Sequence, residues 1–182
     1  MISVQLIPFL SDNSATQYDD DIEVIATLSR SHQEITAEFT LRGDISHIQW
    51  PAVQSQPQRG IELWKHTCFE LFIADSASHG YWEYNFSPSR QWAVYAFSDY
   101  RQPVNAAVTT TPNVDVPRVS DTTFTLGIKF PVDAVFAKKT LSVGVSAVIE
   151  YRDGALRYFA LAHGAQRPDF HRRDSFLIKL HP

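Results

Sequence analysis

The sequence predicts an all-β fold, a two-sheet antiparallel β-sandwich in which residues 1–182 form a single domain. Apolar and polar residues alternate with a period of two in many short runs, and turn-forming residues separate nearly all of these runs. Many short strands joined by brief loops are typical of such sandwiches. A chain of this length buries roughly 70% of the surface that it exposes when unfolded, so one sizeable core is expected.

The clearest strand is the run 34–42, in which Ile35, Phe39 and Leu41 face one way and charged or hydroxyl side chains face the other. The same pattern predicts further strands at 2–7, 22–29, 45–50, 67–74, 81–86, 92–98, 122–130, 141–151, 156–161 and 175–180. The Arg-Asp-Gly sequence at 152–154 predicts a tight hairpin. One helical turn is expected at 132–136, and an edge strand with a loop at 104–119, where two prolines suit an edge position.

Composition limits the class of partner. The net charge of −4 and the pI near 5.9 argue against a nucleic-acid-binding protein, although Arg167, Arg172 and Arg173 cluster among acidic residues in what we interpret as an ion-paired loop. The single cysteine, Cys68, rules out an intramolecular disulfide, and no apolar run approaches the roughly 18 residues of a membrane span. Since the first residues also lack the pattern of a signal peptide, we expect a cytoplasmic protein that does not bind membranes.

The stretch 63–101 carries the densest set of unusual side chains. Strand periodicity places Thr67, Phe69, Leu71 and Ile73 on a core face, which leaves a second face with the members His66, Cys68, Glu70 and Phe72. In the run 81–86, Glu83 and Asn85 share a face opposite to Trp82. If the two runs pair as a hairpin, Glu70 and Glu83 approach each other on one sheet face. Such carboxylates beside a histidine can serve acid or base chemistry or hold the hydroxyls of a sugar, and they can equally form a solvated face.

A second polar stretch lies at 162–176, where His163, Asp169 and His171 gather around Gly164 and Pro168. Loops of this kind often hold binding residues at the rim of a rigid sandwich. A plain connection between the last two strands is an equal alternative.

Common catalytic and metal-binding motifs are absent from the sequence. It contains no glycine-rich phosphate loop and no G-x-S-x-G elbow, and the spacing of His66, Cys68 and Glu70 matches no zinc pattern. We therefore assign no catalytic and no metal-binding residue. A lone cysteine is more often a buried core residue than a nucleophile.

Several motifs give the chain a resemblance to a known family. They are LW-x-HTCFELF at 63–72, YNFSPS at 84–89 with Trp92, Tyr100-Arg101, PDFH at 168–171 and DSF at 174–176. With these motifs the chain resembles a bacterial family of DOMON-like proteins related to the family 9 carbohydrate-binding modules. The resemblance covers about two thirds of the chain, and it implies a β-sandwich of jelly-roll or immunoglobulin-like architecture.

Members of this superfamily bind sugars or haem. The resemblance implies that Trp64, Trp82 and Trp92 are aromatic platforms for a sugar, with hydrogen-bonding partners at Glu70, Glu83, Asn85 and Arg101. The related modules carry an acidic residue where this chain has His66 and Thr67, which departs from their sugar site. Haem-binding relatives use an axial methionine, and the sole methionine here is Met1; the remaining haem alternative pairs His163 or His171 with His66.

We therefore expect a non-catalytic module that binds a carbohydrate or another small polar ligand and needs no cofactor. The alternatives are an enzyme that uses Glu70 and Glu83 with a histidine on a sugar-like substrate, a haem-binding domain, and a protein-interaction domain that docks a protein partner or a second copy of itself as a homo-oligomer. The candidate ligand-binding residues are Trp64, His66, Glu70, Glu83, Asn85, Trp92, Arg101, His163, Asp169 and His171.

Overall fold

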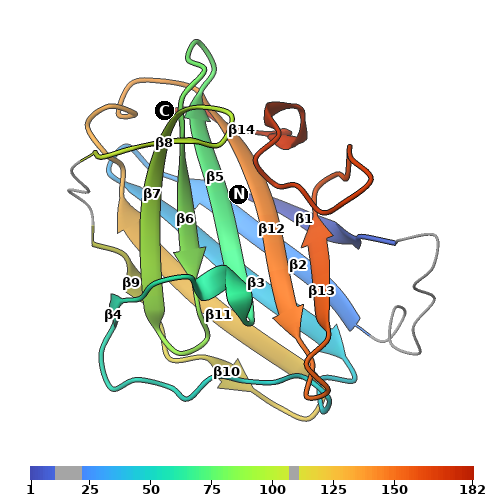
Figure 1. Ribbon diagram of the computed structural model, residues 1–182. Helices are drawn as coiled ribbons and strands as arrows, with labels where there is room; N and C mark the ends of the chain where they lie inside the picture. The colour runs from blue at the N-terminus through green and yellow to red at the C-terminus, as the bar shows by residue number, and fades with distance from the viewer. Residues whose placement is uncertain (11–21, 107–110) are drawn as a thin grey trace.

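The structure is a computed structural model that describes residues 1–10, 22–106 and 111–182 (Figure 1). Its strands form two layers, which we call the front sheet and the back sheet. The front sheet contains, in order, β13 (Leu156–Ala160), β12 (Leu141–Glu150), β5 (Cys68–Asp75), β6 (Tyr81–Phe86), β7 (Gln91–Asp99) and β4 (Gln58–Arg59). Two short strands extend it, since β14 (Ile178–Leu180) pairs with β12 and β8 (Gln102–Val104) pairs with β7.

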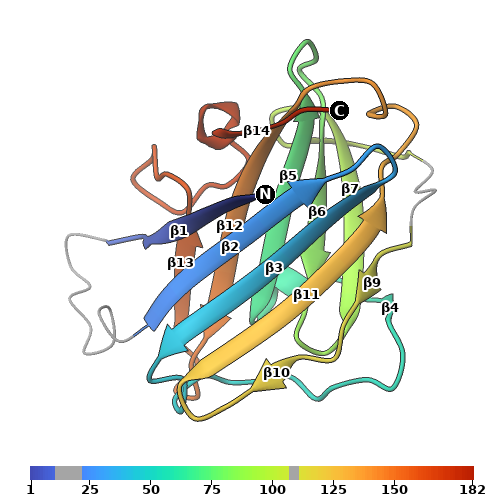
Figure 2. The same ribbon diagram turned by 180° about the vertical axis from the view of Figure 1, so that it is seen from behind.

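The back sheet, which faces the viewer in Figure 2, contains β10 (Arg118–Val119), β11 (Thr123–Pro131), β3 (Glu34–Gly43), β2 (Ile22–Arg30) and β1 (Ile2–Pro8), with β9 (Asn113–Val114) also paired to β11. Strand β1 connects the two sheets, because residues 2–6 pair with β2 and residues 7–8 pair with β13. All of these strand pairs are antiparallel except the short parallel pair of β4 with β7. The sequence prediction of a two-sheet antiparallel sandwich is confirmed.

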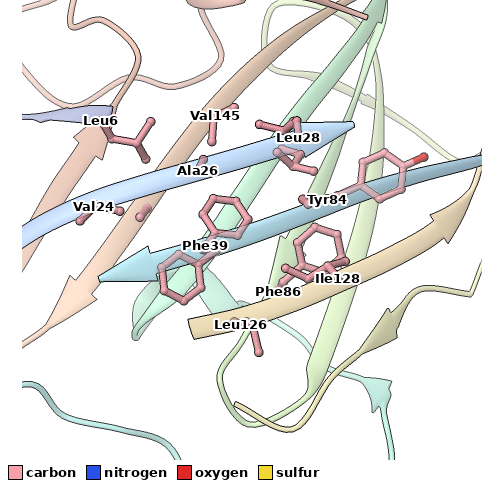
Figure 3. Close-up of a cluster of buried hydrophobic side chains, with 14 of the residues drawn as sticks. Leu6, Val24, Ala26, Leu28, Phe39, Tyr84, Phe86, Leu126, Ile128 and Val145 are labelled. Carbon is pink, nitrogen blue, oxygen red and sulfur yellow. The ribbon is translucent and has the colours of Figure 1, made fainter. Parts of the chain in front are cut away.

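The core lies between the sheets and is built from the apolar half of each alternating strand. Figure 3 shows Phe39 from the back sheet and Tyr84 and Phe86 from the front sheet pointing into the same space. Phe39 stacks on Phe69 with ring centroids 4.8 Å apart, and Tyr84 stacks on Phe130 at 4.7 Å. Because strand side chains alternate, this packing turns the other half of the front sheet's residues away from the core. We call that side the outer face.

Most of the predicted strands agree with the structure to within one or two residues, and the hairpin at 152–154 joins β12 to β13, with Gly154 at φ 84°. The strand predicted at 45–50 is wrong: Asp44 accepts hydrogen bonds from the backbone and hydroxyl of Ser46, and only Ile48 forms an isolated bridge, to Tyr151. The last strand begins at Ile178 and not at 175, since a 3-10 turn occupies Arg173–Ser175.

The helical turn predicted at 132–136 is replaced by successive tight turns. The guanidinium group of Arg30 donates hydrogen bonds to the carbonyl oxygens of Phe136, Ala137 and Lys139 at 2.6 to 3.1 Å. These carbonyls are therefore bonded to a side chain instead of continuing a helix.

The edge segment predicted at 104–119 is formed in part. It contributes the end of β8 and the short strands β9 and β10, while residues 107–110 lie outside the described part of the chain. No helix in residues 1–10, 22–106 or 111–182 has the length and apolarity needed to cross a membrane.

Candidate functional site

A cavity of about 620 Å³ opens on the outer face of the front sheet. Charged, aromatic and aliphatic side chains from six strands and three connecting segments line it. They are Trp64, Lys65, Glu70, Phe72, Glu83, Tyr95, Phe97, Arg101, Pro103, Val148, Leu156, Tyr158, Pro168, Phe170 and His171.

Strand register builds the floor of this cavity. Phe72 on β5 lies directly opposite Glu83 on β6, and Glu83 lies opposite Tyr95 on β7. Residues that face each other across an antiparallel pair point to the same side of the sheet, so all three side chains reach the outer face. Glu70 lies two residues before Phe72 on β5 and is therefore a diagonal neighbour of Glu83. The sequence prediction that these two carboxyl groups share one face is confirmed.

A short 3-10 helix, η1 (Leu63–Lys65), forms one rim of the cavity. Leu63 is buried against Cys68 and Ala93, which fixes η1 on the sheet. The ring of Trp64 contacts Tyr95 edge to face at 5.6 Å and stays 38% exposed, so one side of the indole is open to the cavity.

The opposite rim is formed by the turn between β7 and β8 and by the loop that follows β13. Asp169 ties these two segments together, because its carboxylate accepts hydrogen bonds from the Tyr100 hydroxyl at 2.7 Å and from the Arg101 guanidinium at 3.0 Å. Arg101 adopts the left-handed conformation with φ 53°.

The loop after β13 is anchored on the sheet by Phe176, which packs against Phe72 and Tyr81. Gly144 on β12 permits this packing, since a Cβ at this position would lie 2.7 Å from a ring atom of Phe176. Arg173 adds hydrogen bonds to the backbone oxygens of Asp75 and Gly80. The rim that carries Asp169 and His171 is therefore held by both packing and polar contacts.

The two carboxyl groups on the floor are buried, with 2% of Glu70 and 6% of Glu83 exposed. Ser146 donates a hydrogen bond to Glu70 Oε2 at 2.7 Å, and Asn85 Nδ2 donates to Glu83 Oε1 at 2.6 Å. The pKa of Glu70 is raised to about 8. Burial is the largest cause, and the negative charge of Glu83 is the second. Burial also raises the pKa of Glu83, which the Asn85 hydrogen bond and the charge of Arg101 oppose.

His171 lies at the edge of this floor and is held in its neutral form. Burial, with the charge of Arg101, lowers the pKa of His171 to about 4. The Tyr81 hydroxyl oxygen accepts a hydrogen bond from the backbone N–H of Arg101 at 3.1 Å and lies 2.8 Å from His171 Nδ1. This arrangement favours donation from the hydroxyl to Nδ1, which leaves the ring proton on Nε2, 3.6 Å from Glu83 Oε2.

The structure brings half of the candidate residues together at the cavity, namely Trp64, Glu70, Glu83, Arg101 and His171. Asn85 and Asp169 do not line the cavity but hydrogen-bond to Glu83 and Arg101, which do. The two polar stretches that the sequence singled out therefore converge on one site.

The other candidate residues lie elsewhere. Trp92 points into the core with 7% of its surface exposed, because its register partner is the core residue Phe86, and Trp82 packs against the same core. His66 pairs with Glu150 at 2.8 Å in a separate hollow, and His163 Nε2 contacts the Ile7 carbonyl oxygen at 2.8 Å. These placements correct the expectation that Trp82 and Trp92 act as platforms and that His66 and His163 belong to the site.

Strand periodicity placed Phe72 on the same face as Glu70, but sequence reasoning missed four other aromatic residues that line the cavity, Tyr95, Phe97, Tyr158 and Phe170. A signal for two of them was present, because Tyr95 and Phe97 alternate with the core residues of β7. Phe170 comes from a loop, where periodicity carries no information.

Within the described part of the chain, no group of three or more histidine, cysteine, aspartate or glutamate side chains could hold a metal ion. Cys68 is fully buried, and its thiol contacts Asn85 Oδ1 at 3.5 Å. Burial raises the pKa of this thiol well above its usual range, as expected for a structural cysteine.

No family model matches the sequence, and a search of curated proteins found no match. Among solved structures, the chain is similar to a candidate carbohydrate-binding protein from Bacteroides uniformis, with a TM-score of 0.66 and 15% identity over 96% of this chain and 84% of that chain. It is also similar to a family 9 carbohydrate-binding module from Caldicellulosiruptor kristjanssonii in complex with glucose, with a TM-score of 0.56 and 7% identity over 93% of this chain and 78% of that chain. At these identities the similarity establishes a shared fold, a β-sandwich.

Proposed function

We propose that this chain is a non-catalytic binding module whose outer-face cavity takes a carbohydrate. One observation carries the proposal. The floor of the cavity holds two buried carboxyl groups, Glu70 and Glu83, and aromatic side chains line the cavity around them. A sugar can use both kinds of group in this site. Its hydroxyl groups can hydrogen-bond to the carboxyl groups, and its C–H surface can stack on the aromatic rings.

The dimensions and rigidity of the cavity support this proposal. Its volume of about 620 Å³ lies within the range of roughly 300 to 1,000 Å³ that is common for small-molecule sites. The floor residues lie on paired strands, and Arg101 is fixed by Asp169. A preformed site of this kind loses little side-chain entropy on binding. The similar module that was solved with glucose shares the fold, which makes glucose and its oligomers the first ligands to test.

The test is calorimetric titration of the full chain with glucose, cellobiose and a panel of other neutral and charged sugars. We expect saturable binding of at least one sugar. The Trp64→Ala variant should lose about tenfold or more in affinity, because it removes the one partly exposed indole at the rim.

Leu177→Ala is the matched control, since Leu177 is 58% exposed and lies outside the cavity. This variant should bind as the unmodified chain does. Silence across the whole panel, or equal losses in the two variants, would contradict the proposed site.

A second candidate function is hydrolysis of a glycoside, favoured by one specific observation: two carboxyl groups share the cavity and differ in their hydrogen-bonding partners. The backbone positions of diagonal neighbours in an antiparallel pair lie roughly 7 to 8 Å apart, which allows their carboxyl groups to reach the ~5 to ~9.5 Å separations of glycosidase carboxyl pairs. With its raised pKa, Glu70 would be the acid, and Glu83 would be the base or nucleophile. Release of nitrophenol from nitrophenyl glycosides, abolished by Glu83→Gln, would support this function, and its absence across the common glycosides would exclude it.

A further inference from the structure

We propose that the preferred ligand is a sugar with a protonated amino group, which binds at the Glu70–Glu83 pair. The inference rests on the proposed function that the cavity takes a carbohydrate, and it specifies the class of sugar. Three features of the cavity floor support it: two buried carboxyl groups without a lysine or arginine partner among the described residues, one oxygen of each carboxyl group left for a ligand, and surrounding aromatic rings.

The first feature is buried acid without a direct cationic partner. Among the described residues, neither Glu70 nor Glu83 forms an ion pair with a lysine or arginine. Arg101 lines the same cavity, but its guanidinium hydrogen-bonds to Asp169 at 3.0 Å. A buried carboxyl group ordinarily has a charged partner or enough hydrogen bonds to offset its desolvation. A cationic group on the ligand would supply that partner.

The second feature is the direction of the hydrogen bonds. Ser146 engages Oε2 of Glu70, and in the described part of the chain no donor reaches Oε1 of this side chain, which is 2% exposed and lines the cavity. Asn85 engages Oε1 of Glu83, and Oε2 lies 3.6 Å from His171 Nε2. One oxygen of each carboxyl group is therefore left for a ligand. An ammonium group has three donors and no acceptor, so it can serve both oxygens at once.

The third feature is the aromatic lining around this floor. Phe72 and Tyr95 lie on either side of Glu83 in the strand register, and Trp64 stands at the rim against Tyr95. Aromatic faces attract cations and also stack on the C–H surface of a sugar ring. A ligand that combines a sugar ring with an ammonium group would use both properties of this lining.

Several other titratable or charged groups surround the pair. They come from η1, β5, β6, β7, the turn after β7 and the loop after β13, and are Lys65, Cys68, Tyr81, Tyr95, Arg101 with Asp169, and His171. Lys65 pairs with Glu62 at 2.7 Å and His171 is neutral, so neither opposes a cation strongly. In the empty cavity at pH 7, Glu70 carries a proton because its pKa is raised to about 8. A bound ammonium group lowers that pKa, so binding should release this proton.

The experiment compares glucosamine, glucose and N-acetylglucosamine by calorimetric titration of the full chain at pH 7 and constant ionic strength. Each titration is repeated in phosphate and in HEPES, whose different heats of ionisation report proton release. We expect glucosamine to bind about tenfold or more tightly than either neutral sugar, since hydrogen bonds to charged groups are the stronger ones. We also expect proton release with glucosamine and none with glucose.

The Glu70→Gln and Glu83→Gln variants test whether the pair carries this preference. In each variant the affinities for glucosamine and glucose should differ by no more than about threefold. The amide has the shape of the carboxyl group but cannot carry its negative charge. Glu38→Gln is the matched control, since Glu38 lies on the back sheet in an exposed pair with Arg118. It should keep the full preference.

The outcomes separate this inference from the proposed function. If glucose binds as tightly as glucosamine, or if glucosamine binds without releasing a proton, the cavity takes carbohydrates but the inference is wrong. If none of the three sugars binds, the inference is wrong, and silence across the wider panel of sugars would refute the proposed carbohydrate site as well. The proton measurement on the unmodified chain stands even if a variant fails to fold.

Discussion

Replacing Glu70 by glutamine should stabilise the empty protein, and the gain should grow with pH. Glu70 is 2% exposed, and burial raises its pKa to about 8, whereas the same group in an unfolded chain has a pKa of about 4.3. Between these two values the folded state holds a proton that the unfolded state releases. Stability due to Glu70 is therefore present below the unfolded pKa and is lost as pH rises toward the folded pKa.

The size of the effect follows from the same shift. One pKa unit corresponds to about 1.4 kcal/mol. The ionisation of Glu70 should therefore lower the free energy of unfolding by roughly 3 to 5 kcal/mol as the pH rises from 5 to 8. Glutamine has the shape of the protonated acid, can still accept the Ser146 hydrogen bond, and does not titrate. Glu70→Gln should therefore match the unmodified chain near pH 4 and exceed its stability by up to that amount at pH 8.

Urea unfolding of both proteins between pH 4 and pH 9, followed by tryptophan fluorescence, measures this difference directly. The curves of unfolding free energy against pH should diverge through pH 5 to 8 and run parallel above that range. Glu38→Gln, on the exposed side of the back sheet, should give a nearly constant difference. A pH-independent difference for Glu70→Gln would show that Glu70 ionises normally and would refute the electrostatic account of the cavity floor.

Three further predictions concern packing and hydrogen bonding. Trp92→Ala should lower the free energy of unfolding by about 3 to 5 kcal/mol because the ring is buried. Trp64→Ala should lower it by less than about 2 kcal/mol, because this ring is partly exposed. Chemical denaturation of the two variants measures the difference. Gly144→Ala should cost about 1 to 3 kcal/mol and increase proteolysis of the loop after β13, because the added methyl group meets Phe176; unaltered proteolysis would contradict this role. Ser146→Ala should be more destabilising at pH 9 than at pH 6, since its hydroxyl bonds to the carboxylate form of Glu70, and thermal unfolding at the two pH values checks the sign.

The floor of the cavity could be predicted from the sequence, and the reason is geometric. A period of two assigns Glu70 and Glu83 to one face as soon as the hairpin between their strands is recognised, and the structure has this register. The same rule excludes Trp92 from the ligand-binding residues. Trp92 lies opposite the core residue Phe86, so its side chain points to the core side of β7. The position of Trp92 in its strand, and not its aromatic character, decides that its ring is buried in the core.

The rim could be predicted only in part. Asp169 and His171 were recognised as members of a shaped loop, yet nothing in the sequence places that loop beside the turn after β7. That contact depends on Phe176 packing over Gly144, a long-range fit between a loop and a strand surface. His66 and His163 carry polar side chains but lie outside the cavity lining, where they contact Glu150 and the Ile7 carbonyl oxygen.

Backbone strain adds a final argument for a preformed site. In the described chain the non-glycine residues with positive φ are Glu62, Arg90 and Arg101, and two of them adjoin the cavity. Each such residue costs about 1 kcal/mol or more that glycine would avoid. Glycine could not replace their side chains, since Glu62 holds Lys65 and Arg101 lines the cavity while bonding to Asp169. The left-handed turn at Arg101 also directs its backbone N–H to the Tyr81 hydroxyl, which in turn contacts His171, so one strained residue fixes both a charge at the rim and the proton position on the neighbouring imidazole.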